Sequence, residues 1–199
     1  MKIFEIKNLL LFIIIIIISM DCLSNAPKTE CDLHAEFYDP LKKSEGIDWE
    51  DLNGEQAILD CENALKDYPN EQRFKYQLAR GFYKDEQFDK AQSIFLELAK
   101  LNYPYAFMEL GYLNYYEEFG NFNYESITYF SKALEFNIYA SDRYLALSYY
   151  YLDEYEKAEK YFLAALQNNN YSASYKTLIK YNLGNNYYYW TDEFGSPKM

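Results

Sequence analysis

The sequence predicts an all-α protein, an α-solenoid built from stacked antiparallel helix pairs. Two observations favour this fold class. Glycine and proline are scarce, at 7 and 5 of 199 residues, which argues against a many-turned β-sandwich or β-barrel. Apolar residues also recur at steps of three and four residues over most of the chain, the period of helices that bury one face.

The first 26 residues have the layout of a secretory signal peptide. Two lysines precede an unbroken apolar run from Leu9 to Ile18. A run of this length is too short to cross a bilayer, which takes about 20 apolar residues, so no stable membrane span is expected after cleavage. Ser24-Asn25-Ala26 resembles a cleavage site of small residues, and cleavage after Cys22 or Ser24 stays open. We therefore expect export, to the periplasm or out of the cell.

The three cysteines fit this expectation. A lipid-modified Cys22 is disfavoured, because Asp21 stands where lipoprotein signals carry a small residue. Cleavage removes Cys22 and leaves Cys31 and Cys61, which are expected to form a disulfide in an oxidising compartment. Two free buried thiols are the alternative. No metal site is expected, because the single histidine, His34, has no ligand cluster around it.

Residues 27–52 are expected to form a loop-rich segment with one short helix at 30–36, tied to the rest of the protein by Cys31. Asp39-Pro40 and the polar stretch from Lys42 to Gly46 predict an irregular path. The helical-repeat array is expected over 53–192, and residues 193–199 are predicted to be a disordered tail.

A sequence repeat divides the array into helix pairs. A leucine followed by a small residue occurs at Leu78-Ala79, Leu110-Gly111 and Leu145-Ala146, and Leu183-Gly184 starts a truncated fourth unit. Each of the first three is followed by a small residue with an aromatic residue four positions later, at Ala91 and Phe95, Ser126 and Phe130, and Ala158 and Phe162. The small residues let the two helices of a pair approach closely, and the aromatic residues fill the space between them. Because one pair cannot bury its own apolar face, neighbouring pairs must stack.

The same periodicity predicts the helix positions. Helices are expected at 53–68, 71–84, 87–101, 104–118, 123–136, 139–152, 154–168 and 171–189. Turn residues separate several of them, at Pro69-Asn70, Asn102-Tyr103-Pro104, Gly120-Asn121 and Asn168-Asn169-Asn170.

The charge and the aromatic content restrict the partners. The formal net charge is −12, and a field of that sign repels phosphate backbones, so nucleic acid is not an expected partner. A solvated surface is a sufficient explanation of the charge. The 24 tyrosines and 14 phenylalanines fit either helix packing in an AT-rich genome or an aromatic binding surface, and we attribute most of them to packing.

These repeats resemble the tetratricopeptide repeat and its relative, the Sel-one-like repeat, which implies a right-handed superhelix. The first and third units are similar to the plain tetratricopeptide form, and the second has the longer loop of the Sel-one-like form. An N-terminal block also resembles that of exported bacterial Sel-one-like proteins. Its parts are Cys31-Asp32-Leu33-His34-Ala35, Asp39-Pro40, Ala57-Ile58-Leu59-Asp60-Cys61-Glu62-Asn63-Ala64, Pro69 and Arg73-Phe74-Lys75-Tyr76-Gln77-Leu78-Ala79-Arg80. The function that the resemblance implies is protein–protein scaffolding.

In tetratricopeptide arrays, fixed positions on the first helix of each pair line a concave groove. The resemblance implies a groove of Tyr76, Arg80, Tyr83, Met108, Tyr112, Tyr115, Arg143 and Tyr150. The chain's three arginines, Arg73, Arg80 and Arg143, all fall on such positions. Arginine binds carboxylates through paired hydrogen bonds and tyrosine supplies rigid contact area, so this groove suits an extended peptide or a C-terminal carboxylate. The favoured alternative for Arg73 and Arg80 is that they pin the N-terminal segment through Asp32 or Glu62.

The sequence predicts no catalytic residues and no cofactor. It has no glycine-rich phosphate loop, HExxH or GxSxG motif, and no serine or cysteine nucleophile arrangement accompanies His34. We expect an exported scaffold that binds a protein or peptide and does not act as an enzyme. Two alternatives stay open: an envelope enzyme of the cysteine-rich Sel-one-like type, acting on β-lactams or the cell wall, and a secreted effector.

Overall fold

The structure is a computed structural model that describes residues 26–37, 46–116 and 124–190, without the side chains of Tyr115, Tyr116 and Trp190. The leader up to residue 25, the Asp39-Pro40 stretch and the predicted tail lie outside the described residues. Helices in the described ranges are α2 (Glu30–Ala35), α3 (Gly54–Asp67), α4 (Gln72–Lys84), α5 (Phe88–Lys100), α6 (Pro104–Tyr116), α7 (Tyr124–Glu135), α8 (Ser141–Tyr151), α9 (Tyr155–Gln167) and α10 (Ala173–Trp190).

Local signals place the helix ends. The Asn53 side chain accepts a hydrogen bond from the Gln56 amide at 3.1 Å and so caps α3, as N-cap asparagines commonly do. In the turns between helices, Glu86, Asn102 and Asp153 have φ angles of 59°, 58° and 59°, the left-handed conformation that reverses the chain after a helix. The predicted helix ranges agree with these helices to within two residues at each described end.

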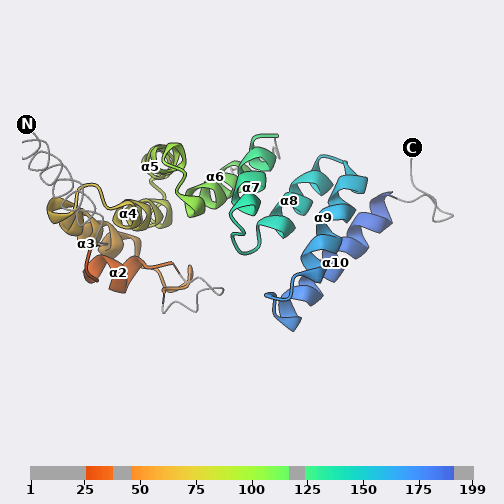
Figure 1. Ribbon diagram of the computed structural model, residues 1–199, viewed down its shortest axis with the longest axis horizontal. Helices are drawn as coiled ribbons and strands as arrows, with labels where there is room; N and C mark the ends of the chain where they lie inside the picture. Colours follow the sequence, from red (N-terminus) through yellow and green to blue (C-terminus); the bar gives the residue numbers. More distant parts are fainter. Residues whose placement is uncertain (1–25, 38–45, 117–123, 191–199) are drawn as a thin grey trace, which may run out of the picture.

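Consecutive helices pack against each other along the whole array, which confirms the predicted α-solenoid of stacked antiparallel pairs. Figure 1 shows the row of helices running from α2, α3 and α4 at one end to α10 at the other. The pairs of the repeat are α4 with α5, α6 with α7, and α8 with α9. In the described part of the chain, α10 has no second helix after it.

Within each pair, the small and aromatic residues of the repeat form the core. Phe95, Phe130 and Phe162, on α5, α7 and α9, have no exposed surface. Gly111 on α6 shows how close the helices lie, because a β-carbon there would come within 2.4 Å of the Phe130 ring. At Gly111, the small residue of the repeat thus permits the close approach of α6 and α7.

In the described parts of the segment before α3, residues 26–37 and 46–53, α2 is the one helix. The two described parts meet at a single bridge between Phe37 and Ile47, where the Ile47 amide donates to the Glu36 carbonyl at 2.7 Å. Over the described ranges, no helix has the length and apolar content needed to cross a membrane.

Candidate functional site

Aromatic side chains join the first helix of each pair to the first helix of the next. We refer to α4, α6, α8 and α10 as the A helices and to α5, α7 and α9 as the B helices. Ring pairs connect successive A helices, with centroid distances of 5.8 Å for Tyr76–Tyr105, 4.7 Å for Tyr112–Tyr144 and 6.1 Å for Tyr150–Tyr189. We call this line of contacts the tyrosine seam. It uses several of the positions that the resemblance assigned to an open groove.

Three predicted groove residues are buried. The exposed fractions are 2% for Tyr76, 2% for Arg80 and 4% for Met108, so no ligand reaches these side chains. The prediction of an open groove is wrong at these three positions, because neighbouring helices and the N-terminal segment cover them. The remaining members with described side chains are half-buried, namely Tyr83, Tyr112, Arg143 and Tyr150. The Tyr115 side chain lies outside the described residues.

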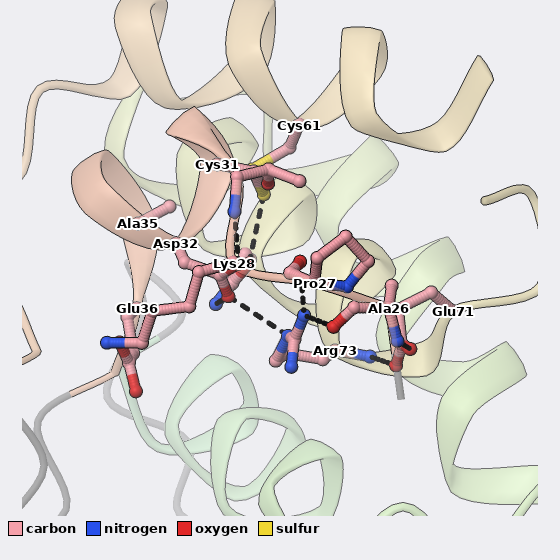
Figure 2. A network of polar contacts seen from close by, with 12 residues as sticks. Ala26, Pro27, Lys28, Cys31, Asp32, Ala35, Glu36, Cys61, Glu71 and Arg73 are labelled. Atoms are coloured by element: carbon pink, nitrogen blue, oxygen red, sulfur yellow. Dashed lines mark hydrogen bonds and ion pairs between the residues drawn. A yellow bond between two sulfur atoms is a disulfide. The ribbon is translucent and has the colours of Figure 1, made fainter. Parts of the chain in front are cut away.

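Arg73, at the start of α4, binds the beginning of the described chain (Figure 2). Its Nη2 donates to the carbonyl of Ala26 at 2.9 Å, and its Nε lies 3.0 Å from Oδ1 of Asp32. Glu71 completes the contact, because its Oε2 accepts a hydrogen bond from the Ala26 amide at 3.1 Å. Ala26 is 8% exposed and belongs to the hydrophobic core. The main chain at Ala26 is thus bound from both sides.

Arg80, two turns further along α4, binds the same segment at two later points. Its Nη1 donates to the Ala35 carbonyl at 2.7 Å, and its Nη2 donates to the Ile47 carbonyl at 3.2 Å. Lys84, one turn on, donates to the Trp49 carbonyl at 2.8 Å. Arg73, Arg80 and Lys84 on α4 therefore bind main-chain carbonyls of the N-terminal segment, while Lys75 pairs with Glu97 on α5.

Trp49 covers one of the predicted groove residues. Its ring packs on Tyr83 with centroids 5.2 Å apart, and the Lys84 ammonium lies 5.1 Å from the Trp49 ring centre. Trp49 itself remains 40% exposed. The N-terminal segment therefore occupies the surface around Tyr83 that the resemblance assigned to a ligand.

A disulfide between Cys31 and Cys61 joins α2 to α3 within this network (Figure 2) and confirms the predicted pairing. Beside it, Gln77 donates through Nε2 to Asp32 Oδ1 at 3.0 Å, so Asp32 is held by both Gln77 and Arg73. The interpretation that Arg73 pins the N-terminal segment through Asp32 is confirmed. The other candidate, Glu62, is exposed on α3.

A buried carboxyl group lies next to this region. The hydroxyl of Tyr76 donates to Oε1 of Glu109 on α6 at 2.7 Å, and Glu109 is only 7% exposed. Burial raises the pKa of Glu109, an effect that the nearby Arg80 charge and the Tyr76 hydrogen bond offset in part. Burial and the Glu109 charge also raise the pKa of Tyr76.

We predict that Glu109→Gln stabilises the protein at neutral pH. Below the unfolded pKa of about 4.5 the carboxyl is protonated in both states. As pH rises through the raised folded pKa, the folded state must either retain a proton or bury a charge, so stability falls. The amide avoids this loss and still accepts from Tyr76. We expect a Tm gain of about 2–4 °C at pH 7 and a flatter Tm profile between pH 4 and 8.

Glu62→Gln, at an exposed position, is the matched control and should keep the wild-type slope. Some slope should remain in Glu109→Gln, because burial also raises the pKa of Asp142. A profile for Glu109→Gln that parallels the wild type over this pH range would contradict the role given to Glu109.

Arg143 on α8 differs from the other two arginines. Its guanidinium carbon lies 5.0 Å from the Tyr144 ring centre and 5.6 Å from the Tyr175 ring centre on α10. Its Nε is buried and makes no hydrogen bond among the described residues. The rest of the guanidinium does interact with the two tyrosines: burial lowers the pKa of Arg143, but the charges and hydrogen bonds of Tyr175 and Tyr144 raise it overall. No described carboxylate lies within ion-pair distance of it. Arg143 thus keeps a desolvated donor between two tyrosine rings.

The acidic residue next to Arg143 is bound elsewhere. Asp142 is 6% exposed, and its Oδ1 accepts hydrogen bonds from the Tyr171 hydroxyl and, at 2.8 Å, from the Arg143 amide. The Tyr171 hydroxyl in turn accepts from the Ala140 amide at 3.0 Å. Asp142 therefore ties α8 to the turn before α10 and does not neutralise the Arg143 side chain.

The sequence did not predict the tyrosines that surround Arg143 or the Tyr76–Glu109 pair. Glu109 did carry a signal, since it is the one charged residue in the stretch 104–116, where Asn114 is the one other strongly polar side chain. No sequence signal distinguishes Tyr175 from the many other tyrosines, because its contact with Arg143 depends on how α10 packs beside α8.

The remaining polar candidate is His34. Its Nδ1 lies 2.7 Å from Oδ2 of Asp60, and it is half-exposed on α2. Where the structure describes the chain, no group of three or more His, Cys, Asp or Glu side chains is arranged to hold a metal ion.

Comparison of the chain with models of protein families finds no match, and comparison with curated proteins finds none either.

Proposed function

We propose that this protein is an exported interaction scaffold that binds a segment of another protein at Arg143. The helical-repeat fold suits protein binding, because stacked pairs present long surfaces made of side chains from several helices. The observation that carries the proposal is the buried Arg143 Nε without an acceptor, between Tyr144 and Tyr175. A buried donor left unpaired costs about 1–3 kcal/mol, and an oxygen atom of a ligand would remove that cost.

The protein's own N-terminal segment supports this chemistry. Arg73 and Arg80, on the same set of A-helix positions, bind four main-chain carbonyls and one carboxylate between them. Arg143 can bind main-chain carbonyls or a carboxylate in the same way, and no segment among the described residues supplies such a group to it. An extended peptide could therefore contact Arg143 as Ala26, Ala35 and Ile47 contact α4 through their main-chain carbonyls. A C-terminal carboxylate fits best, because a guanidinium can bind both of its oxygens.

The test is quantitative affinity capture from envelope extracts with the wild type, Arg143→Ala and Leu163→Ala. Leu163 is exposed on α9 and serves as the matched control. We expect a partner that the wild type and Leu163→Ala recover equally and that Arg143→Ala depletes at least tenfold. Thermal melts establish that all three proteins are folded. Equal recovery of the same partner by Arg143→Ala would remove Arg143 from the binding site.

Synthetic peptides with the partner's C-terminal sequence then test the ligand chemistry. A free-acid peptide should bind at least tenfold more tightly than its C-terminal amide if Arg143 recognises a carboxylate. Equal affinities would favour recognition of main-chain carbonyls.

Export implies a cleavage point, and the contacts of Ala26 bear on where it lies. Cleavage after Ala26 would remove the amide and carbonyl that Glu71 and Arg73 bind. We therefore place cleavage before Ala26, after Ser24 or Cys22. N-terminal sequencing of the secreted or periplasmic protein should begin at Asn25 or Leu23, and a sequence beginning at Pro27 would contradict this placement.

A further inference from the structure

The repeat places one small residue at the same position of every A helix. These residues are Ala79, Gly111, Ala146 and Gly184. In the first three units a B helix packs over this position, and its aromatic residue lies in the same core cluster or in direct contact. At Gly111, a β-carbon would lie 2.4, 2.6 and 2.8 Å from three atoms of the Phe130 ring. At Gly184, a β-carbon would meet nothing within 4 Å.

The residues around Gly184 are more exposed than their counterparts in the other units, which are buried or half-buried where their side chains are described. Tyr181 is 67% exposed, whereas Tyr76 and Met108, which hold its position in the first two units, are 2% and 4% exposed. Tyr188 is 75% exposed. Tyr181, Gly184 and Tyr188 are spaced by three and four residues, so they share one face of α10. We call it the outer face of α10.

The opposite face of α10 is packed on α9. Ile179 and Leu183 are 0% and 8% exposed in the core cluster that they share with α9, and Asn186 donates to the Tyr155 carbonyl at 3.0 Å. In the described part of the array, α10 is thus an A helix that is packed on one side and lacks a B helix on the other.

The charge of α10 restricts what can cover the outer face. Residues 173–190 contain Lys176 and Lys180 and no acidic residue, although the chain as a whole carries a formal charge of −12. Two copies of α10 facing each other would bring these lysines together, which disfavours a symmetric pair. An acidic helix is favoured instead.

We propose that the outer face of α10 binds an acidic amphipathic helix of a partner protein, docked as a B helix docks within the array. The proposal rests on the proposed function as an interaction scaffold, but it places a second contact surface away from Arg143. The B helices show what fits: a small residue, and four positions later an aromatic residue that packs over the small residue of the A helix. In the partner, that aromatic ring would lie over Gly184 between Tyr181 and Tyr188.

A peptide with the α7 sequence, residues 124–135, is the probe. It carries Ser126 and Phe130, the pair that packs on Gly111. An isolated helix of 12 residues is marginal in water, so a covalent staple replaces Thr128 and Lys132, which are both exposed in α7. The staple also removes the only basic residue, and the peptide then carries Glu125 and Glu135 as its charges.

Binding to the full chain is measured by fluorescence anisotropy of the labelled peptide. We expect saturable binding that weakens several-fold from 50 to 500 mM NaCl. Gly184→Leu places a bulky side chain where the aromatic ring of the partner helix would lie, and it should weaken binding at least tenfold. The double variant Tyr181→Ala/Tyr188→Ala should weaken binding to the same extent. A peptide with Phe130→Ala should lose affinity to the same extent. Leu163→Ala should bind like the wild type.

The outcomes separate this proposal from the proposed function. Suppose that Arg143→Ala binds the stapled peptide like the wild type and Gly184→Leu does not. The outer-face proposal is then supported, whether or not the affinity capture supports binding at Arg143. If Gly184→Leu and the double tyrosine variant bind like the wild type, or if no saturable binding occurs, the outer-face proposal is overturned. Loss of peptide binding in Arg143→Ala alone would place the peptide at Arg143 and overturn it too.

Discussion

Replacing Cys31 and Cys61 with alanine should lower the free energy of unfolding by about 3–4 kcal/mol. The disulfide closes a loop with a sequence separation of 30, and cross-linking a loop of that size reduces the entropy of the unfolded chain by this order. Both side chains are fully buried, so their loss also leaves a small cavity that adds to the effect. Urea denaturation followed by circular dichroism measures the change.

A comparison with and without reductant isolates the cross-link from the packing. Wild-type protein unfolded and refolded in reductant should lose most of the same free energy, while the double alanine variant should not respond to reductant. Equal midpoints for oxidised and reduced wild type would show that the cross-link contributes little. The contacts of Arg73, Gln77 and Arg80 with the N-terminal segment would then suffice to hold it.

Gly111→Ala should destabilise the protein by about 1–3 kcal/mol, although alanine is the better helix former. The added methyl group would overlap the Phe130 ring at 2.4 Å, and Phe130 is fully buried between α6 and α7. Since the ring has no free space to move into, the two helices must separate. We expect a Tm decrease of about 2–10 °C by differential scanning calorimetry.

Gly184→Ala is the matched control at the same position of the repeat. Nothing lies within 4 Å of its β-carbon, so alanine should stabilise α10 by about 0.5–1 kcal/mol through helix propensity. A second-site change tests the cause at Gly111. Adding Gly111→Ala to a Phe130→Leu protein should cost less stability than adding it to the wild type, because the smaller leucine leaves room for the methyl group. A Gly111→Ala protein as stable as the wild type would contradict the close approach of α6 and α7.

The helices and their pairing could be predicted because they depend on local periodicity. Spacing by three and four residues places each helix, and the recurrence of a small residue with a later aromatic residue identifies which helices pair. The disulfide could be predicted from the number of cysteines outside the predicted signal peptide. These features are short-range in sequence or compositional, so a single sequence contains them.

The exposure of the groove positions could not be predicted correctly, because it depends on distant parts of the chain. Arg80 is buried by the carbonyls of Ala35 and Ile47, which lie 45 and 33 residues before it. Tyr76 and Met108 are covered by packing between neighbouring helices. Tetratricopeptide register identifies which face a residue belongs to, but not whether another segment of the same chain already occupies that face.

The position of Trp49 makes the N-terminal segment optically observable. Its indole packs on Tyr83 of α4, and the tyrosine seam begins on the same helix. Light absorbed by these tyrosines can pass to the indole only while the segment stays docked. In a Trp190→Phe variant, which leaves Trp49 as the single tryptophan, emission excited through tyrosine would therefore follow release of residues 46–52 from α4 in real time, without any attached dye.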